Sequence, residues 1–156
     1  MLRNVKSVDR VEELMPLIRE ALDSGQSVRF YPRGISMLPM LRQDIDSVVL
    51  SPVKGRLKKY DLPLYRRDDG KYVLHRVIAV SDTYTCMGDN QFVPEAGLRQ
   101  DQMIAVVTAF FRGERTISVS SRSYRLYCVL WTGSAQLRNL YRRVKNRLKR
   151  ILQRRK

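Results

Sequence analysis

Between residues 27 and 119 the sequence is a succession of short runs rich in β-branched and aromatic residues, and turn residues separate one run from the next. Such runs are typical of β-strands. An Asp69-Gly70 pair between two of them favours a hairpin. The predicted strands are residues 27–31, 47–50, 62–66, 72–80, 83–87, 103–111 and 116–119. We therefore expect a mainly β, mostly antiparallel domain.

Helical periodicity replaces this pattern at both ends of the chain. Residues 8–24 repeat apolar side chains on one face, with Pro16 inside the pattern and Gly25 as the C-terminal stop. After Gly133, apolar residues recur at helical spacing opposite a face of Arg and Lys, which predicts a basic amphipathic helix. For a chain of one-domain length we expect an N-terminal helix (1–26), a β domain (27–119) and a basic helical tail (120–156).

The net charge of +15 is a property of the C-terminal tail. Residues 1–114 contain 17 Lys and Arg and all 15 Asp and Glu, whereas residues 115–156 contain 13 Lys and Arg and no acid. Three interpretations of the tail stay open: packing of its apolar stripe on the β domain, adsorption to an anionic membrane surface, and binding to nucleic acid. We rank nucleic acid last, because Tyr141 is the one aromatic residue of the basic helix predicted after Gly133.

The two cysteines, Cys86 and Cys128, have neither the spacing of metal ligands nor that of a disulfide framework. We expect no metal and no cofactor. The N-terminal stretch has no long apolar run, so we expect neither a signal peptide nor a membrane anchor there. These features predict a cytoplasmic protein, with peripheral association at the inner face of the membrane as the variant.

Three polar residues in turns or strands are candidates for catalysis. Ser36 lies between the turn residues Gly34 and Pro39, His75 is the only histidine, and Asp89 lies within a Gly-Asp-Asn turn. Each alone is an ordinary structural residue: a turn serine, a satisfied strand histidine, a turn aspartate. Together they are the residue types of a serine hydrolase, because serine needs an adjacent base to act as a nucleophile.

These residues belong to ordered blocks that resemble the signal peptidase I superfamily, which includes LexA-like self-cleaving repressors. The resemblance covers roughly residues 27–110 and implies a mostly antiparallel β fold with serine peptidase activity. Here the base position is a histidine, as in the endoplasmic-reticulum and archaeal type. The blocks are Gly34-x-Ser36-Met37-x-Pro39, Asp46-Ser47-Val48-Val49, Tyr60-Asp61-Leu62-Pro63-Leu64-Tyr65, Leu74-His75-Arg76-Val77-Ile78 and Gly88-Asp89-Asn90.

The resemblance implies Ser36 as nucleophile, His75 as general base and Asp89 as the acidic partner that orients the imidazole, with Glu95 and Asp101 as alternatives. The rate is then expected to rise with pH through a pKa of about 6–7. Many relatives have a hydroxyl residue at the position of Gly34, so the oxyanion is expected to bind backbone N–H groups alone. The residues expected around the substrate are Gly34, Ile35, Met37 and Pro39.

The sequence therefore predicts a serine endopeptidase acting on a peptide or protein substrate. The alternative is a catalytically inactive relative that binds a peptide, a membrane surface or nucleic acid, the last two through its basic tail. The substrate, self-cleavage and the oligomeric state stay open at this point.

Overall fold

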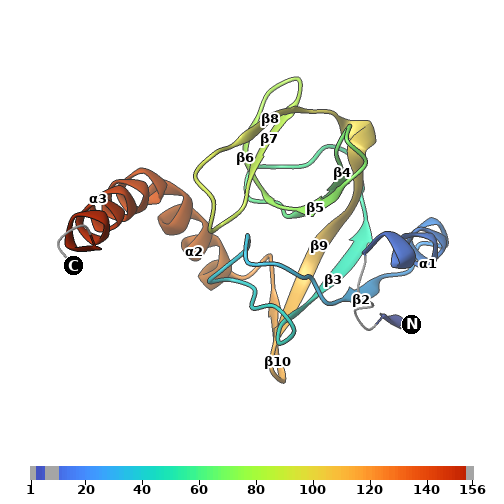
Figure 1. Ribbon diagram of the computed structural model, residues 1–156. Coiled ribbons are helices and arrows are strands. Elements are labelled where there is room, and N and C mark those ends of the chain that lie inside the picture. Colours follow the sequence, from blue (N-terminus) through green and yellow to red (C-terminus); the bar gives the residue numbers. More distant parts are fainter. Residues whose placement is uncertain (1–2, 6–10, 154–156) are drawn as a thin grey trace.

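The computed structural model describes residues 3–5 and 11–153, and its strands form two sheets (Figure 1). The larger sheet has the order β1-β2-β3-β9-β4-β5, with β10 paired to β9, and the smaller has the order β6-β7-β8. Of the pairs described, β1 and β2 are parallel and the others antiparallel. The strands are β1 (Arg3–Val5), β2 (Val28–Phe30), β3 (Ser47–Pro52), β4 (Pro63–Arg66), β5 (Tyr72–Leu74), β6 (Arg76–Val80), β7 (Tyr84–Met87), β8 (Glu95–Leu98), β9 (Met103–Arg112) and β10 (Arg115–Ser118).

Helix α1 (Val11–Asp23) covers the larger sheet. Its apolar face packs with side chains of β2, β3, β4 and β9 in the main hydrophobic core, and Ile18 is fully buried. The helix continues through Pro16. The predicted helix is thus confirmed from residue 11, while residues 8–10 lie outside the described part. A second core, which contains Tyr65, Val77, Tyr84 and Cys86, fills the space between the sheets.

The predicted strand 72–80 is two strands in different sheets, and this corrects the sequence interpretation. β5 pairs with β4 in the larger sheet, whereas β6 pairs with β7 in the smaller one. The chain changes sheets at His75, which belongs to neither strand. A residue at such a crossing is not held in the hydrogen-bond ladder of either sheet, so its side chain can turn into a pocket.

Three elements were not predicted: β1, which lies inside the segment expected to be the N-terminal helix (1–26), β8, and the short 3-10 helix η1 (Gln100–Gln102). Glu95–Leu98 forms β8 although it contains Ala96 and Gly97, which disfavour strands, because it pairs with β7. Arg122–Gly133 forms helix α2 within the expected helical tail (120–156), although helical periodicity indicated a helix only after Gly133 and its Tyr, Val and Trp residues favour strands. Ser121 caps this helix by accepting a hydrogen bond from the N–H of Tyr124 at 3.3 Å. Tyr124 and Cys128, one turn apart, are buried in the main core.

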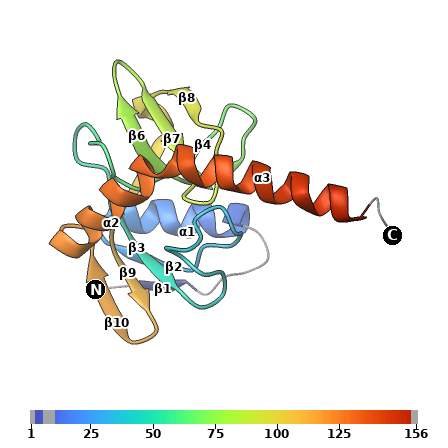
Figure 2. The ribbon, with the colours of Figure 1, turned by 90° about the vertical axis from the view of Figure 1, so that its left-hand side faces the viewer.

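Helix α3 (Ala135–Gln153) follows α2 and extends beyond the two sheets (Figures 1 and 2). The described side chains of its apolar stripe face solvent: Leu137 is 71% exposed and Tyr141 is 68% exposed. The side chains of residues 148, 151 and 152 lie outside the described part. The polar face is the one turned to the body, where Arg138 donates to the carbonyl oxygens of Asp89 and Trp131. The helix is confirmed, but the interpretation that its stripe packs on the β domain is wrong.

The prediction of a mainly β, mostly antiparallel domain with helices at both ends is confirmed. Over residues 3–5 and 11–153, no helix combines the length and apolar character needed to cross a bilayer.

Candidate active site

Ser36 lies in a loop that buried apolar side chains fix to the main core. The side chains of Met37, Met40 and Leu41 are buried, and the N–H of Leu41 donates to the carbonyl of Met37 at 3.0 Å in a single tight turn. Gly34, with φ +93°, provides the left-handed conformation at which the chain enters this turn. The result is a half-buried Ser36 at the start of a rigid turn.

The Gly-Asp-Asn segment holds this loop against His75. Asn90 donates from its backbone N–H to the carbonyl of Ser36 at 2.8 Å and from its side chain to the carbonyl of Ile35 at 3.1 Å. A β-carbon on Gly88 would lie 2.7 Å from the carbonyl oxygen of Ser36 and 3.1 Å from Nε2 of His75. Only glycine therefore permits this approach, and Nε2 of His75 is turned toward the Ser36 loop.

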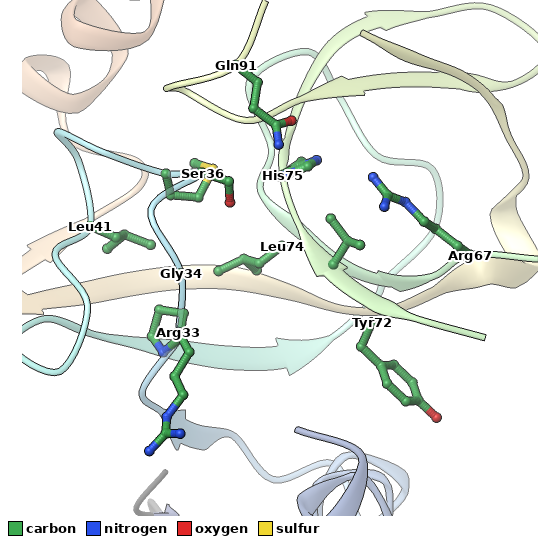
Figure 3. Close-up of a pocket in the computed structure, with 12 residues that line it drawn as sticks. Arg33, Gly34, Ser36, Leu41, Arg67, Tyr72, Leu74, His75 and Gln91 are labelled. Carbon is green, nitrogen blue, oxygen red and sulfur yellow. The ribbon is translucent and has the colours of Figure 1, made fainter. Parts of the chain in front are cut away.

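Ser36 and His75 line the same pocket of about 210 Å³ (Figure 3). Gln91 borders the opening between them, and Arg67 lies on the far side of His75. No hydrogen bond joins the Ser36 hydroxyl to His75 among the described residues. Both polar groups are thus brought to one cavity without a hydrogen bond between them.

The hydrogen bonds of His75 define its tautomer. The hydroxyl of Tyr65 donates to Oε2 of Glu95 at 2.7 Å, and its oxygen lies 3.3 Å from Nδ1 of His75. Because the single Tyr65 proton is given to a carboxylate, Nδ1 of His75 must carry the proton that joins the two rings. Nε2 is then left with its lone pair, which is the arrangement that a general base requires.

Charged neighbours tune this chain of hydrogen bonds. Arg67 holds Glu95 in a bidentate ion pair, with Nη2 2.6 Å from Oε2 and Nε 2.8 Å from Oε1. Burial alone would raise the pKa of Glu95, but its hydrogen bonds with Arg67 and Tyr65 lower it overall. Burial, followed by the positive charge of Arg67, lowers the pKa of His75 to about 4. The imidazole is therefore neutral at pH 7, and the expected pKa of about 6–7 is corrected downward.

Asp89 does not contact the imidazole, which corrects the expected role as its acidic partner. Both of its carboxylate oxygens accept from Arg76 at 2.8 Å, and Tyr127 donates to Oδ2 at 3.0 Å. The Arg76 and Asp89 side chains are 0% and 1% exposed. Asp89 is committed to a buried ion pair, and Glu95, reached through Tyr65, is the carboxylate connected to His75.

The other predicted residues divide between the pocket and its surroundings. Gly34 and Met37 line the pocket with Ser36, and Ile35, 65% exposed, lies on the adjoining surface. Pro39 is exposed and lies outside this pocket. Asp101 is exposed and pairs with Arg99, away from His75.

Sequence reasoning assigned no role to Tyr65, Arg67 or Gln91. The signal for Tyr65 was present: the predicted Asp-Gly hairpin joins its strand to the one that precedes His75. In the structure Tyr65 is opposite Val73 in that ladder. Counting the register would have placed the Tyr65 ring beside the histidine. Arg67 and Gln91 lie in a turn and a loop, where no periodicity indicates direction.

In the described part of the chain, no group of three or more His, Cys, Asp or Glu side chains is placed to hold a metal ion. The chemistry available in the pocket is that of a hydroxyl, a neutral imidazole and hydrogen-bond donors. Comparisons of the chain with protein-family models, curated proteins and solved structures gave no significant match.

Proposed function

We propose that the protein is a serine peptidase with Ser36 as nucleophile and His75 as general base. The observation that carries the proposal is the arrangement of His75. Its Nδ1 is satisfied by Tyr65, while its Nε2 faces the Ser36 loop across Gly88. A neutral base with its free nitrogen beside a serine at the edge of one pocket is the arrangement by which a hydroxyl is activated.

The steps follow from these groups. His75 Nε2 takes the Ser36 proton as Oγ attacks a peptide carbonyl, and it returns that proton to the leaving amine. Water then hydrolyses the acyl-enzyme by the same route in reverse. The backbone N–H groups of Ser36 and Met37 have no acceptor among the described residues, which leaves them as donors for the oxyanion. Tyr65 and Glu95 keep the imidazole in the required tautomer.

The test is peptide cleavage by purified protein on a degenerate peptide mixture, read by mass spectrometry. We expect Ser36→Ala and His75→Ala each to abolish cleavage while thermal unfolding shows that the fold is kept. Equal cleavage by wild type and Ser36→Ala would contradict the proposal. Absence of cleavage by the wild type on every mixture would favour the alternative, a catalytically inactive relative that binds peptide.

The outward stripe of α3 favours a second function, adsorption to an anionic membrane surface. Leu137, Leu140, Tyr141 and Val144 are between 49% and 71% exposed. The tail that carries them has 13 Lys and Arg and no acid after residue 114. An exposed apolar stripe on a basic helix is the composition of an interfacial helix.

Co-sedimentation with vesicles tests this second proposal. We expect binding to vesicles with phosphatidylserine and little binding to pure phosphatidylcholine. A Leu140→Gln/Val144→Gln variant should lose the binding and keep peptide cleavage. Unchanged vesicle binding by this variant would contradict the proposal that the apolar stripe of α3 binds the membrane surface.

A further inference from the structure

A second groove, of about 880 Å³, opens beside the pocket and shares Ser36 with it. One side is the nucleophile loop, the floor is the segment that leads from Asn90 into β8, and the other side is α3. The α3 residues that face it are Asn139, Arg142 and Arg143. The groove thus begins at the proposed nucleophile and continues along the basic helix.

The groove has an excess of positive charge. Its charged lining residues are Arg67, Arg142, Arg143 and Glu95. The Glu95 carboxylate is already held by Arg67 and Tyr65. Within the described residues, Arg142 and Arg143 form no ion pair with a carboxylate. Two exposed guanidinium groups therefore face the groove without a partner of opposite charge.

The position of these arginines is fixed by contacts of α3 with the body. The guanidinium group of Arg138 stacks on Trp131, with 3.8 Å from Cζ to the ring centroid, and donates to the carbonyl of Asp89. The Arg142 guanidinium lies 5.2 Å from the ring centroid of Phe92, which is part of the groove floor. The basic face of α3 is therefore held against the site while the apolar stripe faces outward.

We propose that this groove binds an acidic segment of the peptide substrate next to the bond that is cleaved. The proposal rests on the peptidase function proposed above and specifies its substrate class. Glu and Asp side chains match the groove because guanidinium groups bind carboxylates through paired, charge-assisted hydrogen bonds. In the preferred substrate, the acids lie in the part of the peptide that leads from the scissile bond into the groove along α3.

Peptide binding to the Ser36→Ala protein tests the proposal without cleavage. The probe is a fluorescein-labelled decapeptide with four Glu residues, compared by anisotropy with the same peptide in which Gln replaces each Glu. We expect the Glu peptide to bind more tightly and to lose affinity with added salt. Arg142→Gln/Arg143→Gln in the Ser36→Ala background should weaken its binding about tenfold, the expected size for two exposed charge contacts.

The matched control is Lys145→Gln/Arg147→Gln, which removes the same charge from parts of α3 that do not line the groove. We expect less than a twofold change in this control. Equal losses in the two double variants would overturn the proposal, because general attraction to the tail would then explain binding. Equal affinity for the Glu and Gln peptides would overturn it as well.

A single-stranded 20-nucleotide DNA is the competing polyanion in the same assay. Tighter binding of the DNA than of the Glu peptide, with the same sensitivity to Arg142→Gln/Arg143→Gln, would overturn the proposal in favour of nucleic acid. Failure of the peptidase proposal is distinguishable. A preference for the Glu peptide in binding without any cleavage by the wild type would support the acidic-peptide groove and contradict the peptidase. Cleavage that does not depend on Glu would support the peptidase and contradict the groove.

Discussion

His75 and Arg76 are neighbours in the chain and both are buried, yet their surroundings differ in kind. Arg76 is surrounded by acceptors: the Asp89 carboxylate, the hydroxyl of Tyr124 and the sulfurs of Met40 and Cys128. Among the described residues His75 has one hydrogen-bond partner, Tyr65, at 3.3 Å, and its other nitrogen faces a pocket. The first site is complete without a ligand, and the second has hydrogen-bonding capacity left for one.

At the point where the chain changes sheets, Arg76 therefore serves stability, whereas His75 is available for chemistry. A saturated buried ion pair fixes the crossing and attaches α2 to the body, because Tyr124 and Cys128 come from that helix. A partly satisfied imidazole beside it is available for proton transfer. Disrupting the Arg76 site should therefore lower the stability of the fold. Disrupting the His75 site should change the rate of cleavage and its pH dependence.

The largest expected effect comes from Asp89→Asn, which leaves the Arg76 charge buried without its counter-ion. Loss of one partner of a buried ion pair typically costs about 3–5 kcal/mol in the free energy of unfolding. Urea denaturation at pH 7 measures it. Asp69→Asn, in an exposed pair with Lys71, is the control and should change stability little. A small loss in Asp89→Asn would mean that the crossing does not depend on the ion pair.

The next effect is a pH dependence specific to His75. Its pKa in the folded protein is lowered to about 4, whereas an unfolded histidine has a pKa of about 6.5. Between these values the unfolded state binds the extra proton, so stability falls as the pH is lowered from 6.5 toward 4. The expected loss is on the order of 3 kcal/mol.

Denaturation of wild type and His75→Gln at pH 7, 5.5 and 4.5 isolates this component, because Glu95, Asp46 and the other carboxylates are common to both proteins. The stability difference between the two proteins should change with pH in favour of the variant on acidification. Cleavage should stay constant from pH 8 down to about pH 5. A difference that does not vary with pH would contradict the lowered pKa.

The strands and terminal helices were predictable because each has a local pattern of its own. The break at His75 was not, because residues 72–80 contain no Gly, Pro or other turn residue and the change of sheet depends on which partner strand is nearer. Periodicity did not indicate helix α2 for a related reason. Its stability comes from burying Tyr124 and Cys128 in the core and from bonds to Arg76, which are tertiary contacts.

Local pattern also selected Ser36, His75 and the Gly-Asp-Asn turn. The structure places Ser36 and His75 on one pocket, and Gly88 and Asn90 of the turn lie against the Ser36 loop. The partner of Asp89 could not be read from the sequence. Both His75 and Arg76 precede Asp89 at nearly equal separation, and only the direction of the side chains at the sheet crossing decides between them. Glu95 reaches the imidazole through Tyr65, a contact of two steps that no sequence spacing encodes.

Gly88→Ala tests the close approach of the Gly88 backbone to the Ser36 carbonyl and to Nε2 of His75. The added methyl group would lie 2.7 Å from the Ser36 carbonyl and 3.1 Å from His75 Nε2, so one of them must move. Overpacking of this kind costs about 1–3 kcal/mol of stability, and we expect cleavage to fall at least tenfold. Gly133→Ala is the matched control, because its added methyl group would meet nothing within 4 Å. Unchanged cleavage in Gly88→Ala would place the reacting atoms elsewhere.

The smallest effect is expected from Tyr65→Phe, which removes the link between His75 and Glu95 and keeps the ring. Glu95 retains Arg67, and the two hydrogen bonds of the Tyr65 hydroxyl, with Glu95 and with His75, are lost at about 1 kcal/mol each. The imidazole loses the acceptor that holds the proton on Nδ1, and we expect cleavage to fall about tenfold with a changed pH profile. Tyr84→Phe removes another buried hydroxyl, which accepts from the N–H of Leu57 and donates to the side-chain oxygen of Gln100, and should cost similar stability with no change in rate. Equal rates in the two variants would show that Tyr65 only packs against His75 and does not orient it.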